Sequence, residues 1–311
     1  MLPTNYKSFM PAIFFAILAI TFVLAACNTA SAESATTTEV ETTPEPVDTE
    51  EVTMNGNEVF ETDYPEVAVI AADYTFAAPG GVEAGLVMVT LENQGQEPHQ
   101  VQLARLNDGV TIAEFQEALQ AGPEALGLVT WAGGVAAVDP GDKQSVTVDL
   151  TPGTYLLLCF LPDHEGTPHL ALGQLSSFEV GEPSPEKADV ALPQAVGVVK
   201  MLDFAYILPS TIKAGPQVWE IVNAGEQPHE IALIKLAGGK TLADAQAFMA
   251  NPHGTPPFRN IGGLQGIDPG ETGWLNIDLT PGTYAAICHI PDPASGHTHS
   301  ELGMVVPFSV K

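Results

Sequence analysis

The sequence predicts an all-β protein that consists of two similar β-sandwiches, each with a short helical insertion. Three observations support this fold class. Short runs rich in β-branched and aliphatic residues recur along the chain, and Gly, Pro, Asn or Asp bound them. The 311 residues include 29 Gly and 26 Pro, which implies frequent turns and leaves little room for long helices. Similar segments also recur about 130 residues apart, so one unit occurs twice.

The N-terminal segment predicts export from the cytoplasm. Lys7 precedes an apolar run over residues 12–26, and the run ends in Leu-Ala-Ala-Cys. We therefore expect residues 1–26 to be a signal peptide. The last four residues of this segment resemble a bacterial lipobox, which implies that Cys27 is lipidated. An uncleaved membrane anchor is the alternative, although the run is short for a span. Both interpretations place the rest of the chain in the cell envelope, outside the cytoplasmic membrane.

Residues 27–66 are expected to form a disordered, acidic tether. The stretch is rich in Thr and Glu and contains no Lys or Arg. Such a composition cannot bury enough apolar surface to offset the entropy of the chain. A coil of this length spans roughly 35 Å. The tether would therefore hold the following domains clear of the membrane surface.

The charge balance restricts the partners. The chain contains 38 Asp and Glu against 10 Lys and Arg, which gives a net charge of -28 at pH 7. Nucleic acids and anionic membrane surfaces would repel such a protein. An acidic surface favours basic protein partners instead. We expect no nucleic-acid partner.

The internal repeat predicts domains at residues 67–180 and 195–311, with a Pro-containing linker at residues 181–194 between them. The offset of the repeat is 130 residues before the helical insertion and 129 residues after it. A tandem domain duplication explains these offsets. The main shared segments are Asn-x-Gly-x-x-Pro-His at 93–99 and 223–229, Asp-Pro-Gly at 139–141 and 268–270, and Pro-Gly-Thr-Tyr-x-x-x-Cys at 152–159 and 281–288.

The same elements are expected in both domains. Thr111 and Thr241 each look like the N-cap of a helix, and Thr111 with Glu114 forms a capping box. The helical patterns end near Gln120 and Ala250. Alternating or apolar β-rich runs predict the strands. These runs are Val87–Leu91, Val101–Leu106, Ser145–Leu150, Tyr155–Cys159, Val218–Val222, Glu230–Leu236, Trp274–Leu279 and Tyr284–Cys288.

A set of metal-ligating residues recurs at matched positions. Each domain has a single cysteine, which alone favours a buried apolar thiol. The matched histidines weaken that interpretation, because two imidazoles, one thiolate and a weak axial thioether or amide suit copper. The candidate ligands are His99, Cys159, His169 and Gln174 in the first domain, and His229, Cys288, His299 and Met304 in the second.

These motifs resemble the cupredoxin, or blue type 1 copper, family. The Asn-x-Gly-x-x-Pro-His segment is similar to the upstream histidine segment of that family, and the Pro-Gly-Thr-Tyr-x-x-x-Cys segment to its cysteine strand. His-x4-Met at 299–304 is similar to its closing motif, whereas Gln174 replaces the methionine in the first domain. The resemblance implies Greek-key sandwiches with copper at one end and a function in electron transfer. It also makes the second domain the stronger copper candidate.

The sequence departs from the oxidases and reductases of this family. Leu158 and Ile287 precede the two cysteines where the enzymes have a histidine, and the upstream strands lack further histidines. The ligands for a second copper centre are therefore missing, and we expect a protein that is not an enzyme. The longer Cys–His spacing nevertheless resembles the type 1 site of those enzymes.

Several alternatives stay open at this level. His164 could replace His169 as a ligand, although its counterpart is Pro293. His289 and His297 are additional histidines in the second domain, and exposed loop positions explain them. The first domain, with Gln174, could lack copper. In function, the alternatives to an electron carrier are a copper storage or transfer protein and a metal-free surface module. The corresponding partners are a redox protein or a copper donor or acceptor.

Overall fold

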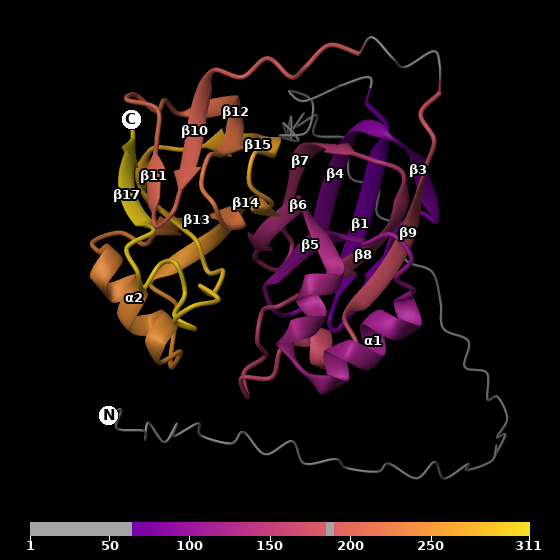
Figure 1. Cartoon of the computed structure of the whole chain (residues 1–311). Coiled ribbons are helices and arrows are strands. Elements are labelled where there is room, and N and C mark those ends of the chain that lie inside the picture. The colour runs from indigo at the N-terminus through magenta and orange to yellow at the C-terminus, as the bar shows by residue number, and fades with distance from the viewer. Residues whose placement is uncertain (1–63, 185–189) are drawn as a thin grey trace, which may run out of the picture. The chain divides into compact units, whose positions relative to one another are not determined.

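The computed structural model describes residues 64–184 and 190–311. The predicted signal peptide, Cys27, nearly all of the predicted tether and the middle of the predicted linker lie outside the described residues. The described chain is an all-β sandwich with few helices, as the sequence predicts (Figure 1). No helix in the described part is long and apolar enough to cross a bilayer.

The first half contains all four strands that the sequence predicts there, most of them longer than predicted. Its elements are β1 (Glu66–Ala72), β2 (Thr75–Ala77), β3 (Gly81–Glu83), β4 (Gly85–Asn93), β5 (His99–Leu106), α1 (Ile112–Ala121), the 3-10 segment η2 (Pro123–Leu128), β6 (Val129–Val138), β7 (Lys143–Leu150), β8 (Gly153–Leu158), the 3-10 segment η3 (His169–Leu172) and β9 (Leu175–Gly181).

The second half repeats nearly the same order. Its elements are β10 (Gly197–Leu202), β11 (Ala205–Ile207), β12 (Gly215–Asn223), β13 (His229–Leu236), α2 (Leu242–Ala250), β14 (Phe258–Ile267), β15 (Thr272–Leu279), β16 (Gly282–Ile287) and β17 (Val305–Val310).

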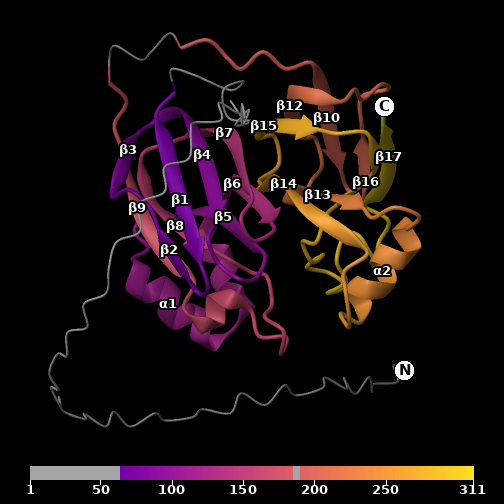
Figure 2. The same ribbon diagram turned by 180° about the vertical axis from the view of Figure 1, so that it is seen from behind.

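Two mixed sheets run through both halves. One has the strand order β11-β10-β12-β15-β7-β4-β1-β2, and the other has the order β17-β16-β13-β14-β6-β5-β8-β9-β3. The halves join where β15 pairs with β7 and β14 pairs with β6, both antiparallel. Figure 2 shows the layers of the first half from behind, with β1 and β4 in front of β5 and β8. The shared sheets are an addition to the predicted pair of sandwiches.

The apolar core lies between the sheets, and the helices cover a second apolar layer. β1 alternates exposed and buried residues, so Val67 and Val69 point into the core. Phe115 of α1 is fully buried against apolar residues of the β5–β8 pair. Both helices begin with a capping box. The second box uses the shorter carboxylate of Asp244, which the sequence pattern does not predict.

Candidate metal centre

The upstream histidine of each half follows a loop that one asparagine holds in place. In the first half, Asn93 is fully buried and donates to the carbonyl oxygens of Glu97 (2.8 Å) and Val138 (2.9 Å). Its side-chain oxygen accepts from the amide of Gly95 (2.9 Å). Asn223 makes the three equivalent bonds in the second half. The asparagine therefore fixes the loop that presents His99 or His229 at the start of its strand.

The glycine of the same motif leaves room for the imidazole. A Cβ atom on Gly95 would lie 2.6 Å from Nε2 of His99 and 2.4 Å from the carboxylate of Asp73. A Cβ atom on Gly225 would lie 2.7 Å from Nε2 of His229. Real Cβ atoms do not approach so closely. The Asn-x-Gly-x-x-Pro-His motif is thus explained by hydrogen bonding at its first residue and close approach at its third.

In the first half, the structure brings His99, Cys159 and His169 into one cluster. One donor atom from each residue lies within 4.8 Å of the others, and all three residues have no exposed surface. Nδ1 of His169 lies 3.2 Å from Nδ1 of His99 and 3.5 Å from Sγ of Cys159. These donors come from β5 and from the segment between β8 and β9. Metal ligation by them stays a prediction, but the geometry assembles a nitrogen–nitrogen–sulfur donor set.

The second half forms an equivalent cluster from His229, Cys288 and His299. Nδ1 of His299 lies 3.0 Å from Nδ1 of His229 and 3.4 Å from Sγ of Cys288. The donor atoms again lie within 4.8 Å of one another, and the three residues are fully buried. The two clusters are nearly identical in their first ring of donors.

Backbone hydrogen bonds fix the segment that carries the downstream ligands. The amide of Leu170 donates to the carbonyl of Cys159 (2.8 Å), and the amide of Gln174 donates to the carbonyl of His169 (2.9 Å). Gly173 closes the segment at φ 107°, a left-handed conformation that favours glycine. Gly303 repeats this conformation at φ 115°. The ligands are therefore held in position by the chain itself.

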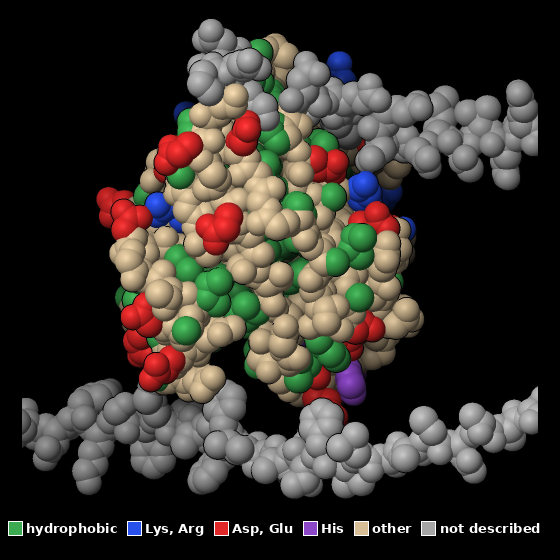
Figure 3. Space-filling model, turned by 90° about the vertical axis from the view of Figure 1, so that its right-hand side faces the viewer, with side chains coloured by type: hydrophobic (Ala, Val, Ile, Leu, Met, Phe, Trp, Pro, Cys, Tyr) green, Lys and Arg blue, Asp and Glu red, His purple; other side chains and the backbone are tan. Residues whose placement is uncertain are grey.

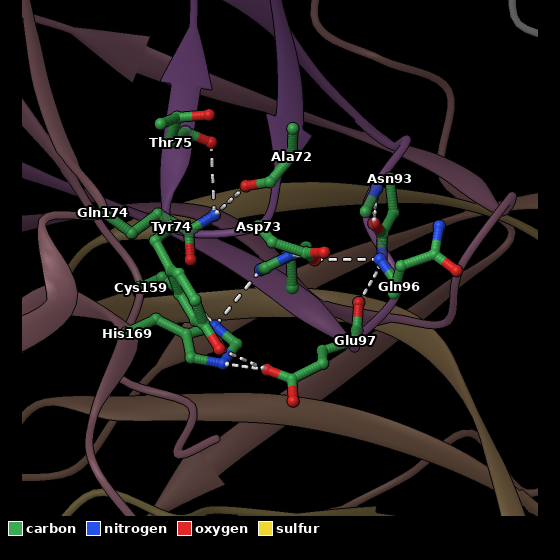
Figure 4. A network of polar contacts seen from close by, with 12 residues as sticks. Ala72, Asp73, Tyr74, Thr75, Asn93, Gln96, Glu97, Cys159, His169 and Gln174 are labelled. Carbon is green, nitrogen blue, oxygen red and sulfur yellow. Dashed lines mark hydrogen bonds and ion pairs between the residues drawn. The ribbon is translucent and has the colours of Figure 1, made fainter. Parts of the chain in front are cut away.

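A fourth donor in the first half has a free lone pair. Nε2 of Gln174 donates to the carbonyl oxygens of Ala72 and Thr75, both at 3.3 Å. Its Oε1 atom is buried and finds no hydrogen-bond partner among the described residues. Figure 4 shows this amide with its oxygen on the side of Cys159 and His169. A buried oxygen without a partner is costly unless something else binds it, so the residues fit an axial ligand to copper.

Met304 is the counterpart of Gln174, and it is also fully buried. Its amide donates to the carbonyl of His299 (2.8 Å), as that of Gln174 does to His169. The donor set of the second half therefore has a thioether where the first half has an amide oxygen. Both sets suit a type 1 copper ion.

An aspartate at each site was not predicted from the sequence. Asp73 lies 3.2 Å from Nε2 of His99, and Asp203 lies 2.9 Å from Nε2 of His229. Burial alone would raise the pKa of each carboxyl, but hydrogen bonds from the histidine and from backbone amides lower it. Such a carboxylate orients a ligating imidazole through its second nitrogen. The recurrence of Asp at an offset of 130 was the available signal.

The residue after each aspartate packs on the downstream histidine. The rings of Tyr74 and His169 meet edge to face at 5.2 Å, and those of Phe204 and His299 do the same at 5.2 Å. Tyr74 and Phe204 are the described non-glycine residues with positive φ, at 64° and 62°. Such conformations cost energy and persist where the surroundings impose them. The strain therefore coincides with the ligand cluster in both halves.

The second nitrogen of the downstream histidine distinguishes the two sites. Nε2 of His169 lies 3.0 Å from a carboxylate oxygen of Glu97, as Figure 4 shows. Nε2 of His299 lies 3.1 Å from the amide oxygen of Gln227. The first site therefore has a negative group where the second has a neutral one.

Burial controls the protonation of the candidate ligands. It lowers the pKa of His99, His229 and His299, which favours the neutral imidazole that metals bind. It raises the pKa of the Cys159 thiol to about 11. The pKa of Cys288 is raised further, by burial and by the charge of Glu230. Metal binding would displace these thiol protons, because the thiolate is the ligand.

The remaining histidines lie outside the clusters. The side chain of His164 is 78% exposed and lies 3.7 Å from Glu97, so His169 and not His164 belongs to the first cluster. His289 and His297 are also exposed, as the sequence predicts. Their positions are consistent with loop histidines.

Comparisons with known proteins show similarity in fold. No protein-family model and no curated protein matches the chain. Auracyanin A, a "blue" copper protein from the green photosynthetic bacterium Chloroflexus aurantiacus, is 18% identical, with 37% of this chain and 98% of that chain covered, at a TM-score of 0.26. A blue copper oxidase from Nitrosomonas europaea is 17% identical, covering 80% of this chain and 86% of its own, at a TM-score of 0.23.

A copper-containing nitrite reductase from Thermus scotoductus is also similar, at 13% identity, 80% coverage of this chain, 61% of that chain and a TM-score of 0.23. These neighbours and the two His–Cys–His clusters support a copper-binding protein of cupredoxin type. The neighbours also correct one expectation. Because enzymes are among the structures of similar fold, the expectation that this chain is not an enzyme is wrong. The absence of a second histidine set does not exclude catalysis.

Proposed function

We propose that this protein is a membrane-tethered, extracytoplasmic copper protein that transfers electrons through type 1 copper sites. The observation that carries the proposal is the buried His–Cys–His cluster, which occurs in both halves. Two imidazole nitrogens, one thiolate and a weak axial ligand are the donors of blue-copper sites. Copper bound there would supply a one-electron couple between Cu(II) and Cu(I).

The chain's own residues would keep the ligands in one arrangement in both oxidation states. The buried asparagines fix the upstream histidines, and backbone bonds fix the downstream ones. Asp73 and Asp203 hold the imidazole rings through Nε2. Rigid ligands reduce the rearrangement that accompanies a change in charge. This rigidity supports electron transfer.

Burial also bears on the alternative of copper storage or transfer. The three clustered residues of each half have 0% exposed surface. A metal that is handed to another protein needs ligands that an acceptor can reach. An electron needs no such opening. The structure therefore supports electron exchange better than metal exchange.

Copper is proposed in both halves. Met304 makes the second half the better site, because a thioether completes the usual donor set. The first half is included because Gln174 has a free, buried oxygen. We further propose that the halves arose by tandem duplication, which explains the repeated offsets of 129 and 130 residues.

Location and partner are proposed from the sequence. The signal peptide and Cys27 would place the protein on the cell envelope through a lipid. The acidic surface would attract a basic redox partner. Acidic side chains outnumber basic ones on the face shown in Figure 3. Fractionation tests the anchor: Cys27→Ser should move the exported protein from the membrane to the soluble fraction.

A Cu(II) titration tests the function. The chain from Asn28 onward would be titrated with Cu(II) while visible absorption and bound copper are measured. The proposal predicts an intense thiolate-to-copper band and two coppers per chain. A protein that stays colourless at stoichiometric Cu(II) would contradict electron transfer through a type 1 site.

A further inference from the structure

Two clefts lie where the halves of the described chain join, and they are lined by equivalent residues. Except for Trp131, each residue that lines the smaller cleft has a counterpart 129 or 130 positions away in the lining of the larger one. The same walls therefore occur twice, on the two sides of the β6–β14 and β7–β15 pairs. Their volumes nevertheless differ, at about 620 Å³ for the larger and about 80 Å³ for the smaller.

Two substitutions between the halves account for the difference in volume. Trp131 lines the smaller cleft, and the equivalent position beside the larger cleft holds Asn260. Ser145 lines the larger cleft, and its equivalent position holds Trp274. An indole in each case stands where the other half has a small polar side chain. The larger cleft falls in the size range of small-molecule pockets, about 300–1,000 Å³.

The charges of the two clefts also differ. Lys143, Lys235 and Arg259 line the larger cleft together with Asp142 and Asp278. The smaller cleft has a single cation, Arg105, with Asp149 and Glu271. The larger cleft therefore has an excess of positive charge in a chain whose net charge is -28. Lysine and arginine are scarce in this protein, so their concentration on one cleft needs an explanation.

The cations reach the larger cleft from different strands. Lys143 begins β7 and has no hydrogen-bond or ion-pair partner among the described residues. Lys235 of β13 donates to the hydroxyl of Thr280, with its ammonium 5.5 Å from the centre of the Tyr284 ring. Arg259 of β14 is paired with Asp142 at 2.7 Å. Lys143 and Lys235 are thus available to an anion, and Arg259 extends the positive wall.

We propose that the larger cleft binds a small organic anion with at least two oxyanion groups, of the dicarboxylate or phosphate-ester class. Lys143 and Lys235 would bind separate oxyanion groups from opposite walls. The Tyr284 ring and Ile261 would contact the hydrocarbon part. This site is separate from the His–Cys–His clusters and does not depend on copper.

Calorimetric titration of the copper-free chain from Asn28 onward tests the site, with citrate and inorganic pyrophosphate as probes at low ionic strength. We expect saturable binding of at least one probe at one site per chain. Binding of citrate alone would indicate a carboxylate ligand, and binding of pyrophosphate alone a phosphate ligand. Absence of saturable binding of both probes would overturn the proposal.

Variants taken from the smaller cleft provide matched controls. Lys143→Thr introduces the residue of the equivalent position and removes no intramolecular bond, so we expect a folded protein with at least a tenfold weaker affinity. Asn260→Trp should abolish binding by filling the cleft. Arg105→Thr, in the smaller cleft, should leave the affinity unchanged. Equal affinities of the wild type and a folded Lys143→Thr or Asn260→Trp variant would overturn the proposed location.

Discussion

The two His–Cys–His clusters match in their inner donors and differ in the residues around them. In both halves, two Nδ1 atoms and one Sγ atom converge in a fully buried cluster. Around that cluster, Glu97 contacts the downstream histidine of the first half, whereas the neutral Gln227 contacts that of the second. The candidate axial donor also changes, from the Gln174 amide oxygen to the Met304 thioether.

This difference separates what holds a metal from what tunes it. The loop motif, the aspartate at Nε2 and the strained aromatic residue occur in both halves, so the geometry of the ligands is the same. The changed residues alter charge and donor type, which are the properties that set a reduction potential. A carboxylate beside His169 favours the higher charge of Cu(II) over Cu(I). An oxygen ligand acts in the same direction, since it suits the harder ion. Both effects predict a lower potential in the first half.

Loss of one thiolate should have the largest effect on the comparison. Cys159→Ser should remove the absorption band and one bound copper from the first half, and Cys288→Ser should do the same in the second. The thiolate is the donor that gives the strong coupling to copper. Visible spectra and copper analysis of both variants measure this result. Two coppers and an unchanged spectrum in either variant would show that the cysteine is not a ligand.

An exchange of the axial donors should bring the potentials of the two sites closer. Gln174→Met should raise the potential of the first half, and Met304→Gln should lower that of the second. Potentiometric titration of each variant measures the shift. Each variant is the control of the other, because the shifts should have opposite signs. Shifts of the same sign would contradict axial ligation by these residues.

An exchange of the groups at the downstream histidine should have a smaller effect in the same sense. Glu97→Gln should raise the potential of the first half, and Gln227→Glu should lower that of the second. Residues that contact a ligating histidine also change metal affinity, by about 10–100-fold. Competition with a chelator measures the affinity of each variant. Unchanged potential and affinity in both variants would exclude an influence of Glu97 on the site.

The helix caps should show the smallest effect and no difference between the halves. Thr111→Ala and Thr241→Ala each remove a capping box and should lower the free energy of unfolding by about 1 kcal/mol. Urea unfolding of the copper-free chain measures both changes. The potentials should not move, because the caps do not touch the ligand clusters. A shifted potential would indicate that the helices position the ligands.

The repeated segments made most of each site predictable from the sequence. The offset between the halves identified the clustered side chains, since chemically unusual residues recur at fixed positions. It missed Asp73 and Asp203, which stand among many other acidic residues and precede a turn with no metal motif. It also missed β6 and β14, whose paired glycines interrupt a strand pattern. The pairing of β7 with β15 and of β6 with β14 is a long-range contact that local periodicity does not encode.

The distinction between carrier and enzyme was the part of the function that sequence reasoning drew wrongly. The argument rested on missing histidines beside Leu158 and Ile287. The fold is shared by carriers and by enzymes, so a missing motif describes one type of centre and not the whole protein.

A spectroelectrochemical titration of the copper-loaded chain from Asn28 onward tests the central claim most directly. The visible band would be followed as the potential is lowered stepwise. The account predicts two separate one-electron steps, of which the step at lower potential is absent in Cys159→Ser and the step at higher potential is absent in Cys288→Ser. A band that does not bleach on reduction, or two steps with the opposite assignment, would contradict it.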